Sequence, residues 1–398
     1  MLATKDRVIT TYALIAILTS IAGFYLATIF VHLGYIPMDD FVSRQWSMTQ
    51  VLVSYTDFGF IKRGLVGSVR YTLFGDTSNG LVIMPVIWTI TAIIAFGVFM
   101  VRSWDEGGYK SRVIMLGIIS CTPIGFMNLT YDFGRTDPVL LLGALSSLLL
   151  IERREYFIAS VISCLMLLTH EIYALVFMPT LLAIVVCDKE DRCRCIEKVV
   201  SFCLLPAIVF IALLVFGDFN GSPSELSLII ENKYSYKFLE NVGDAAPEFV
   251  WTRDLWGNIL FTIGWHNSSF AMSNHVVPLL VFAVTVTLYS KVTRASSSLI
   301  VWSPLMIFPL FLIGVDTLRW FTLINFNMIM IMIHIIATTK IKVEISSEYF
   351  KFTLALLFLS LFYGPAGVGA GVPIEIIPFI MDNFVTSTNY IISSDVVF

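Results

Sequence analysis

The sequence predicts an all-α polytopic membrane protein with about eleven transmembrane helices and interfacial helices in a long first periplasmic loop. Of its 398 residues, 57% are hydrophobic and only 14% are charged, and the mean hydropathy is +0.84. Apolar runs long enough to cross about 30 Å of hydrocarbon recur along the whole chain. Such runs are helical in a membrane, because lipid cannot satisfy backbone polar groups. We therefore expect residues 1–398 to form one integral membrane domain.

The expected spans follow these apolar runs in order. The first run has no Ala-x-Ala cleavage site, so we expect it to remain as an anchor rather than to be removed as a signal peptide. The spans lie near residues 8–33, 81–101, 113–130, 138–151, 157–169, 172–187, 199–216, 276–290, 299–314, 320–338 and 352–364.

Residues 157–187 allow two arrangements. About 30 apolar residues separate two basic loops here, and one tilted helix would place these loops on opposite sides of the membrane. A hairpin of two short helices keeps both loops on the same side and puts His170 and Glu171 at its outer tip. We prefer the hairpin for this reason.

Orientation follows from the lysine and arginine residues of the loops, which are enriched on the cytoplasmic side. A cytoplasmic N-terminus places sixteen of the 25 Lys and Arg residues inside. We therefore expect a multi-pass protein of a bacterial inner membrane with its C-terminus and its active site on the periplasmic side. The six cysteines fall within or beside the spans or in the loop at 187–198, which we place on the reducing side, so no disulfides are expected.

Three outer segments are more than simple connections. Residues 34–80 alternate aromatic, apolar and basic side chains, as interfacial helices do. Residues 217–275 form the largest periplasmic loop, with a polar first half and an aromatic second half. The tail after Gly364 is rich in glycine. The chain therefore divides into a front part at 1–216, this large loop, and C-terminal helices with a tail at 276–398.

Ionisable residues gather at the expected outer ends of the spans, where a charge is costly unless it has a partner or a function. Arginine can bind phosphate through two parallel hydrogen bonds, and a carboxylate or a histidine can accept a proton. We therefore expect an anionic, lipid-linked substrate whose chain lies in the bilayer. The catalytic candidates are Asp39, Asp40, Asp132, Asp137, His170, Glu171 and His266, and the substrate-binding candidates are Lys62, Arg63, Arg135, Arg253 and Arg319.

The same residues have structural explanations, which stay open at this point. Asp39 and Asp40 follow Pro37 and could end the first helix, while Asp137 before Pro138 could cap the next one. Long basic side chains can reach the headgroups as anchors. The structural alternatives are therefore anchors at Lys62 and Arg63, an ion-pair cluster of Asp132, Arg135 and Asp137, and a mutually satisfied pair of His170 and Glu171.

These features together resemble the GT-C class of membrane glycosyltransferases. That class begins with a span, a long outer loop with interfacial helices and an early acidic residue, followed by short hairpins with acidic outer tips. Residues 1–216 match this plan in spacing. The resemblance implies that Asp39 or Asp40 is the base that deprotonates the acceptor hydroxyl, and that Asp132 and Asp137 belong to the second acidic loop.

A narrower resemblance is to the O-antigen polymerases (Wzy), which have a similar length, weak motifs and one large periplasmic loop. In that loop they often carry an arginine, ten residues and then a glycine. Arg253 and Gly264 have this spacing, and His266 follows two residues later. The resemblance implies a periplasmic-face glycosyltransferase in surface polysaccharide synthesis that uses undecaprenyl-(di)phosphate-linked sugar donors, with O-antigen polymerisation as the leading reaction.

The expected partners are an undecaprenyl-linked glycan donor and acceptor, membrane lipids and a chain-length regulator, with no nucleic acid. We expect no cofactor and no dedicated metal site, and leave open whether a divalent metal assists. The sequence contains no Gly-x-x-x-x-Gly-Lys-Ser/Thr phosphate loop. The alternatives are a GT-C transferase that adds a single sugar from a polyprenyl monophosphate, and a flippase or transporter of lipid-linked glycans. A transporter would favour charges near the bilayer midplane and paired repeats.

Overall fold

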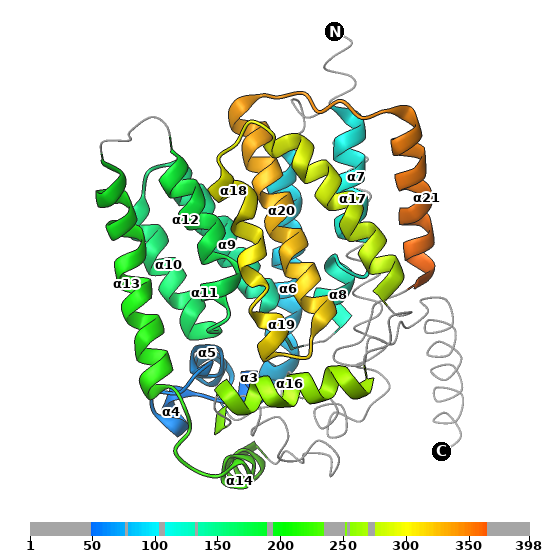
Figure 1. The fold of residues 1–398 in the computed structure, drawn as a ribbon. Coiled ribbons are helices and arrows are strands. Elements are labelled where there is room, and N and C mark those ends of the chain that lie inside the picture. Colours follow the sequence, from blue (N-terminus) through cyan, green and yellow to red (C-terminus); the bar gives the residue numbers. More distant parts are fainter. Residues whose placement is uncertain are drawn as a thin grey trace, which may run out of the picture.

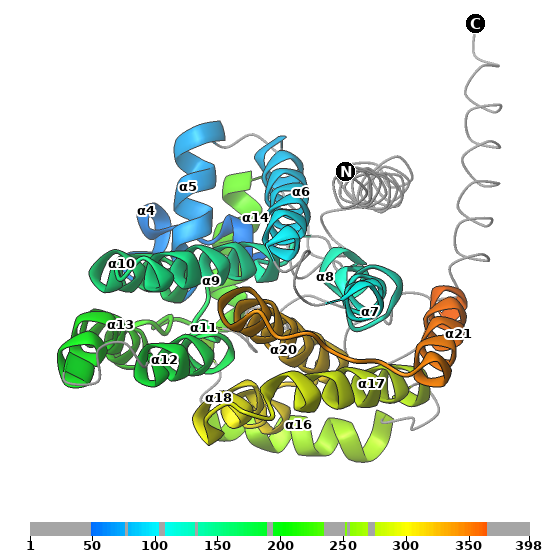
Figure 2. The ribbon, with the colours of Figure 1, turned by 90° about the horizontal axis from the view of Figure 1, so that it is seen from above.

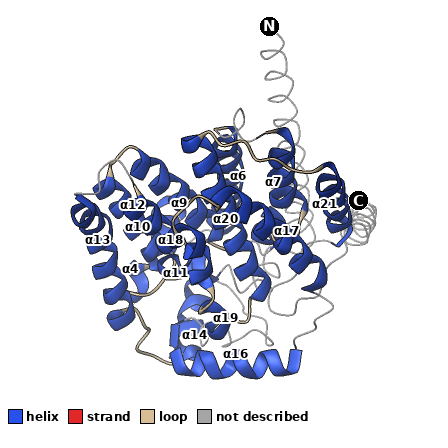
Figure 3. Cartoon of the chain, turned by 45° about the horizontal axis from the view of Figure 1, so that its top comes forward, coloured by secondary structure: helices blue, strands red, loops and turns tan. Residues whose placement is uncertain are grey.

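A computed structural model of the chain describes residues 49–75, 79–102, 108–131, 134–188, 194–234, 251–252, 255–269 and 275–363. Within these ranges the regular structure is helical (Figures 1 and 3). Upright helices form a bundle, and shorter helices gather at its lower end in Figure 1.

The upright bundle is built mainly from ten helices. They are α6 (Asn79–Val101), α7 (Tyr109–Cys121), α8 (Phe126–Tyr131), α9 (Asp137–Glu152), α10 (Tyr156–Thr169), α12 (Met178–Cys187), α13 (Cys195–Phe216), α17 (Val276–Thr293), α20 (Thr317–Thr339) and α21 (Ser347–Tyr363). The shorter or crossing elements are α3 (Thr49–Leu52), α4 (Tyr55–Phe58), α5 (Gly64–Phe74), α11 (Tyr173–Val176), α14 (Pro223–Tyr234), α16 (Leu255–Ser269), α18 (Ser298–Trp302), the 3-10 helix η5 (Ser303–Ile307) and α19 (Leu310–Ile313).

Five segments of the described chain are long and apolar enough to cross a membrane, as expected for a polytopic membrane protein. They are Ile83–Val101, Tyr109–Leu129, Cys195–Phe216, Val276–Thr293 and Thr317–Thr339.

The predicted count of eleven full spans is wrong for this part of the chain. Helices do lie at 138–151, 157–169, 172–187 and 299–314 and in the described part of 352–364, but they are short or interrupted. The 16 residues of α9, for example, reach about 24 Å, which is less than the hydrocarbon thickness of about 30 Å. The expected span at 8–33 lies outside the described residues.

The hairpin predicted at 157–187 is confirmed. Helix α10 ends at Thr169, and His170 then adopts an extended backbone conformation with φ −164° and ψ 122°. The chain turns through Glu171 and returns in α11 and α12. Helix α10 packs against α9 and α13, and α12 packs against the same two helices.

The bundle core contains aromatic contacts and a helix break at which a side chain hydrogen-bonds to a backbone carbonyl group. The rings of Phe96, Phe126 and Phe326 join α6, α8 and α20, with centroid distances of 5.0 to 6.0 Å. Between α7 and α8 the helix is interrupted, and Asn325 of α20 donates from Nδ2 to the carbonyl oxygen of Ile124 at 2.9 Å. Because an unsatisfied backbone group in lipid costs several kcal/mol, this bond makes the break possible.

A layer of crossing helices covers one end of the bundle. Helix α5 is seen end-on in Figure 1 and lengthwise in Figure 2, and α16 lies across the upright helices in Figures 1 and 3. Both helices expose large apolar side chains, including Leu73 of α5 and Trp256 of α16. Helices that lie along a membrane interface have this character. Helices α4 and α5 belong to the loop for which the sequence predicts interfacial helices.

The layer has its own small core, which fixes α5 against α3 and α14. It contains Val51, Leu52, Val53, Ile61, Val66, Leu81, Trp88, Leu226, Ile230 and Trp251. A Cβ atom at Gly67 of α5 would lie 1.9 Å from the carbonyl oxygen of Val53. Only glycine therefore allows α5 to approach the backbone beside α3 so closely.

Replacing Gly67 by alanine should destabilise the protein, because the added methyl group meets backbone that cannot move aside. Overpacking of this kind typically costs about 1–3 kcal/mol. Gly264→Ala in α16 is the matched control, since a Cβ atom there meets nothing within 4 Å. Thermal unfolding of the purified protein in detergent measures both variants. Equal melting temperatures for the two variants would contradict the close packing of α5.

Candidate functional site

An ion pair between α20 and α9 forms the centre of the site. Arg319, in the first turn of α20, donates from Nε and Nη2 to the two carboxylate oxygens of Asp137, both at 2.7 Å. The side chains of Arg319 and Asp137 are 6% and 0% exposed. Two parallel charge-assisted hydrogen bonds are the strongest geometry that an arginine and a carboxylate can make.

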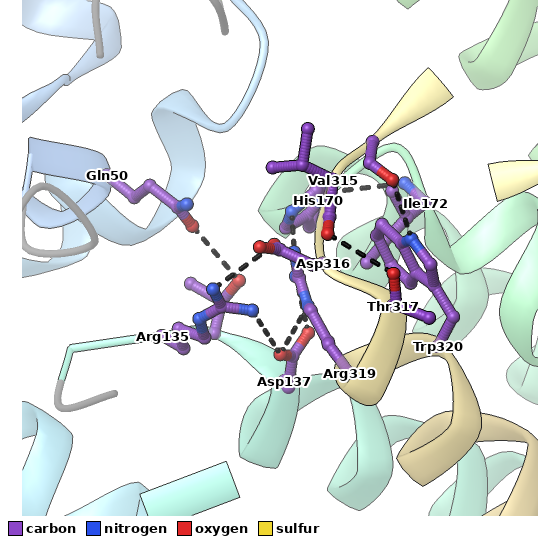
Figure 4. Close-up of polar contacts among 12 residues, drawn as sticks. Gln50, Arg135, Asp137, His170, Ile172, Val315, Asp316, Thr317, Arg319 and Trp320 are labelled. Atoms are coloured by element: carbon purple, nitrogen blue, oxygen red, sulfur yellow. Dashed lines mark hydrogen bonds and ion pairs between the residues drawn. The ribbon is translucent and has the colours of Figure 1, made fainter. Parts of the chain in front are cut away.

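Arg135 and Asp316 complete this buried cluster (Figure 4). The Oδ2 atom of Asp316 accepts from Nη2 of Arg135 at 3.2 Å and from Nη1 of Arg319 at 3.3 Å. The Nη1 atom of Arg135 lies 3.9 Å from Oδ2 of Asp137. Two guanidinium groups and two carboxylates therefore neutralise one another, which is what a low-dielectric site requires.

A second ion pair is connected to this cluster through a histidine. Arg63 donates from Nη2 to Oε1 of Glu171 at 2.6 Å and from Nε to Oε2 at 3.1 Å. The Nδ1 atom of His170 lies 3.3 Å from Oε2 of Glu171, and its Nε2 atom lies 3.3 Å from Nη2 of Arg319. One polar network therefore runs from Arg63 to Asp316.

The partners of His170 fix its tautomer. A guanidinium can only donate, so Nε2 accepts from Arg319 and Nδ1 carries the hydrogen that faces Glu171. The backbone N–H of Ile172 is also 3.3 Å from Nδ1. Nδ1 could accept this bond only in the other tautomer, which would point an Nε2–H at the Arg319 guanidinium. The tautomer with hydrogen on Nδ1 therefore fits the two side-chain partners.

Both residues of this turn, which lies outside the helices, have shifted pKa values. Burial, together with the nearby Arg63 guanidinium, lowers the pKa of His170 to about 4. Burial alone would raise the pKa of Glu171, but Arg63 and His170 hold it well below its usual value. Near neutral pH the neutral imidazole of His170 therefore lies between the Glu171 carboxylate and the Arg319 guanidinium.

Local structure positions the groups of the cluster. Asp137 is the first residue of α9 and is followed by Pro138, whereas the N-cap residue is Thr136, whose side chain makes no capping bond. The structure thus uses the Asp137 carboxylate to hold Arg319 rather than to cap α9. On the other side, Nε1 of Trp320 donates to the carbonyl oxygen of Gly314 at 3.1 Å, which fixes the turn between α19 and α20.

Lys62 stands apart from this network. Its Nζ atom pairs with Asp218, whose side chain is 53% exposed. Its backbone N–H donates to the carbonyl oxygen of Gly217 at 2.8 Å, and its carbonyl oxygen accepts from Nε1 of Trp251 at 2.9 Å. Lys62 therefore joins the segment before α5 to the segment after α13.

Five of the predicted site residues lie in one network with Glu171, and four others lie outside the described residues. Arg63, Arg135, Asp137, His170 and Arg319 lie in the same network as Glu171. His266 belongs to α16. Within the described residues, no group of three or more His, Cys, Asp or Glu side chains could hold a metal ion. The positions outside the described residues are Asp39, Asp40, Asp132 and Arg253.

Asp316 is a site residue that the sequence analysis did not include among the catalytic or substrate-binding candidates. Its Oδ2 atom accepts from two arginines, and it directly precedes the first residue of α20. The available signal was its spacing from Arg319, because side chains three positions apart at a helix start lie close together. Gln50 is a second such residue, and its Oε1 atom accepts from Thr136 at 3.5 Å.

Comparisons with models of protein families, with curated proteins and with solved structures find no match to this chain. What the network does must therefore follow from its own geometry.

Removing Arg319 should destabilise the protein, because Asp137 would remain buried without its partner. Breaking a buried pair in this way typically costs about 3–5 kcal/mol. We expect Arg319→Gln to accumulate poorly in membranes and the double variant Asp137→Asn, Arg319→Gln to recover part of the loss. Lys62→Gln is the control for loss of a cation from a more exposed pair. Membrane abundance and melting temperature measure all three, and a normal melting temperature for Arg319→Gln would refute a structural role of the pair.

Proposed function

We propose that the chain is a membrane glycosyltransferase that acts at the periplasmic face of a bacterial inner membrane and takes its sugar from a polyprenyl-phosphate-linked donor. The observation that carries this proposal is the polar network that runs from Arg63 to Asp316 beside the layer of crossing helices. It combines guanidinium groups, carboxylates and an imidazole at one end of a membrane-embedded bundle.

The level of the network in the membrane supports a lipid-linked substrate. Helix α5 crosses the bundle axis, and its exposed apolar residues suit the boundary between acyl chains and headgroups (Figures 1 and 2). Arg63 is the N-cap residue of this helix. The proposal therefore puts its guanidinium at the depth where a lipid carries its phosphate, with the polyprenyl chain extending into the bilayer.

The chemistry of sugar transfer needs the groups that this network contains. The departing phosphate needs a cation, and the attacking hydroxyl needs a base to accept its proton. The resemblance to the GT-C class assigns the base to Asp39 or Asp40, and Glu171 is the described carboxylate of the network with the greatest exposure.

The described residues favour one phosphate site over two. Polymerisation of O-antigen units would place two polyprenyl diphosphates side by side and would need two separate cationic groups. Arg63, Arg135 and Arg319 instead share one network, and Lys62 is paired with Asp218. Transfer from a single polyprenyl-phosphate donor is therefore the simpler match, and polymerisation would require a second cationic site outside this network.

The orientation can be tested by cysteine labelling. In a variant without the native cysteines, Ser224→Cys in α14 should react with a membrane-impermeant maleimide in spheroplasts. Ser298→Cys, at the opposite end of the bundle in α18, should react only after lysis. Both serines are exposed. The reverse pattern would place the network on the cytoplasmic face and would overturn the proposal.

Deleting the gene in its native host should change the surface glycan. Loss of a single-sugar transferase should keep long chains and remove one sugar, whereas loss of a polymerase should leave at most one repeat unit. Complementation with Arg63→Gln should fail, and complementation with Arg194→Gln, which changes an exposed arginine at the other end of the bundle, should succeed. Gel analysis and mass spectrometry of the glycan measure the result. An unchanged glycan in the deletion strain would exclude both transferase reactions.

A further inference from the structure

The Arg63–Glu171 pair is the most exposed ion pair of the network. The side chains of Arg63 and Glu171 are 11% and 22% exposed. The paired side chains of Arg135, Asp137, Asp316 and Arg319 are at most 7% exposed. A ligand that arrives from the membrane interface therefore meets the Arg63–Glu171 pair first, while the inner cluster is closed by its own contacts.

The geometry of this pair suits an exchange of anions. The carboxylate of Glu171 occupies the fork formed by Nε and Nη2 of Arg63. Two oxygen atoms of a phosphate fit the same fork. Because Glu171 already occupies this fork, a phosphate that binds there takes the place of the carboxylate.

The backbone of Arg63 is held in a conformation that is unusual for a residue with a side chain. Its φ is 62° and its ψ is 14°, in the left-handed region. The next residue packs closely on a neighbour, because a Cβ atom at Gly64 would lie 2.4 Å from the ring of Tyr55. Such strain costs about 1–3 kcal/mol and is concentrated at sites where ligands bind. It aims the guanidinium at Glu171 from a fixed backbone position.

Glu171 also has a second partner, which remains when Arg63 is taken away. Its Oε2 atom lies 3.3 Å from Nδ1 of His170, whose Nε2 atom faces Arg319. Arg319 is fixed in turn by Asp137. The carboxylate would therefore stay oriented after release from Arg63, and loss of the two donor atoms and the positive charge of Arg63 would make it a stronger base.

We propose that the donor phosphate displaces Glu171 from Arg63, and that the released Glu171, rather than Asp39 or Asp40, is the base that receives the proton of the acceptor hydroxyl. This inference rests on the proposed function and adds to it a coupling, because the base becomes available only when the donor is bound. The same coupling would protect the donor from loss to water, since each described carboxylate of the network is paired with an arginine before the donor arrives.

The transfer step balances without another reactant. The acceptor oxygen forms a bond to the anomeric carbon of the donor sugar, and its proton moves to an oxygen of Glu171. The bond between the anomeric carbon and the phosphate oxygen breaks, and its electron pair leaves with the phosphate, which Arg63 neutralises. After the lipid phosphate departs, Glu171 loses its proton to water and pairs again with Arg63.

The test separates binding of a lipid phosphate from transfer. Glu171→Gln keeps the shape of the side chain but removes its charge and its ability to accept the proton. Purified protein in nanodiscs should bind undecaprenyl phosphate as tightly as the unmodified protein, or more tightly, because the internal competitor is gone. Glycan product in the complemented deletion strain should fall by about 100-fold or more. Arg63→Lys should weaken binding, and Glu171→Asp should retain part of the product.

Glu197→Gln is the matched control, because it changes an exposed acid of α13 and should leave both readouts unchanged. Normal product with Glu171→Gln, or binding weakened as much as product, would overturn the exchange while the proposed function stands. If neither Glu171→Gln nor Glu171→Asp accumulates in the membrane, the Arg63–Glu171 pair is structural, and the exchange is also overturned. Failure of the unmodified protein to bind undecaprenyl phosphate, together with an unchanged glycan on deletion, would reject the proposed function itself.

Discussion

The buried pair of Arg319 and Asp137 is the interaction on which the arrangement of the site depends. A charge at the end of a membrane helix is stable only with a partner, and these two residues lie on helices separated by many residues of chain. Their pairing fixes the start of α20 against the start of α9. Asp316 and His170 then accept further hydrogen bonds from the Arg319 guanidinium, and Arg135 donates to Asp316 from the other side.

The need to hydrogen-bond every backbone carbonyl group inside the membrane is the second constraint. The bundle contains interrupted helices, and each interruption leaves carbonyl groups that lipid cannot bind. Asn325 supplies a donor at the break before α8, and Trp320 supplies one at the turn before α20. Both residues belong to α20, which also carries Arg319. Helix α20 therefore supplies hydrogen-bond donors to irregular backbone near it and also carries the central arginine of the polar network.

The network becomes more accessible from its inner to its outer end. Asp137 is fully buried and fixed by two hydrogen bonds, whereas Glu171 is partly exposed and lies in a turn. Rigid pairing is needed where charges are deepest, because an unpaired charge there is most costly. At the outer end a pair can open at lower cost, and the proposed function brings the lipid headgroup to this end. The crossing helices α5 and α16 mark this level in the bundle (Figure 1).

The sequence by itself determined the membrane class, the position of most helices and the identity of most charged residues in the network. Hydropathy suffices for these, because each apolar run must be helical wherever it packs. It also predicted the turn at His170 and Glu171, since the basic loops on both sides had to share one face. Only the tertiary structure decided which helices are long enough to span and which charges meet. Arg63, Glu171 and Arg319 are far apart along the chain, and their partners are chosen by helix packing, which leaves no periodic signal in a single sequence.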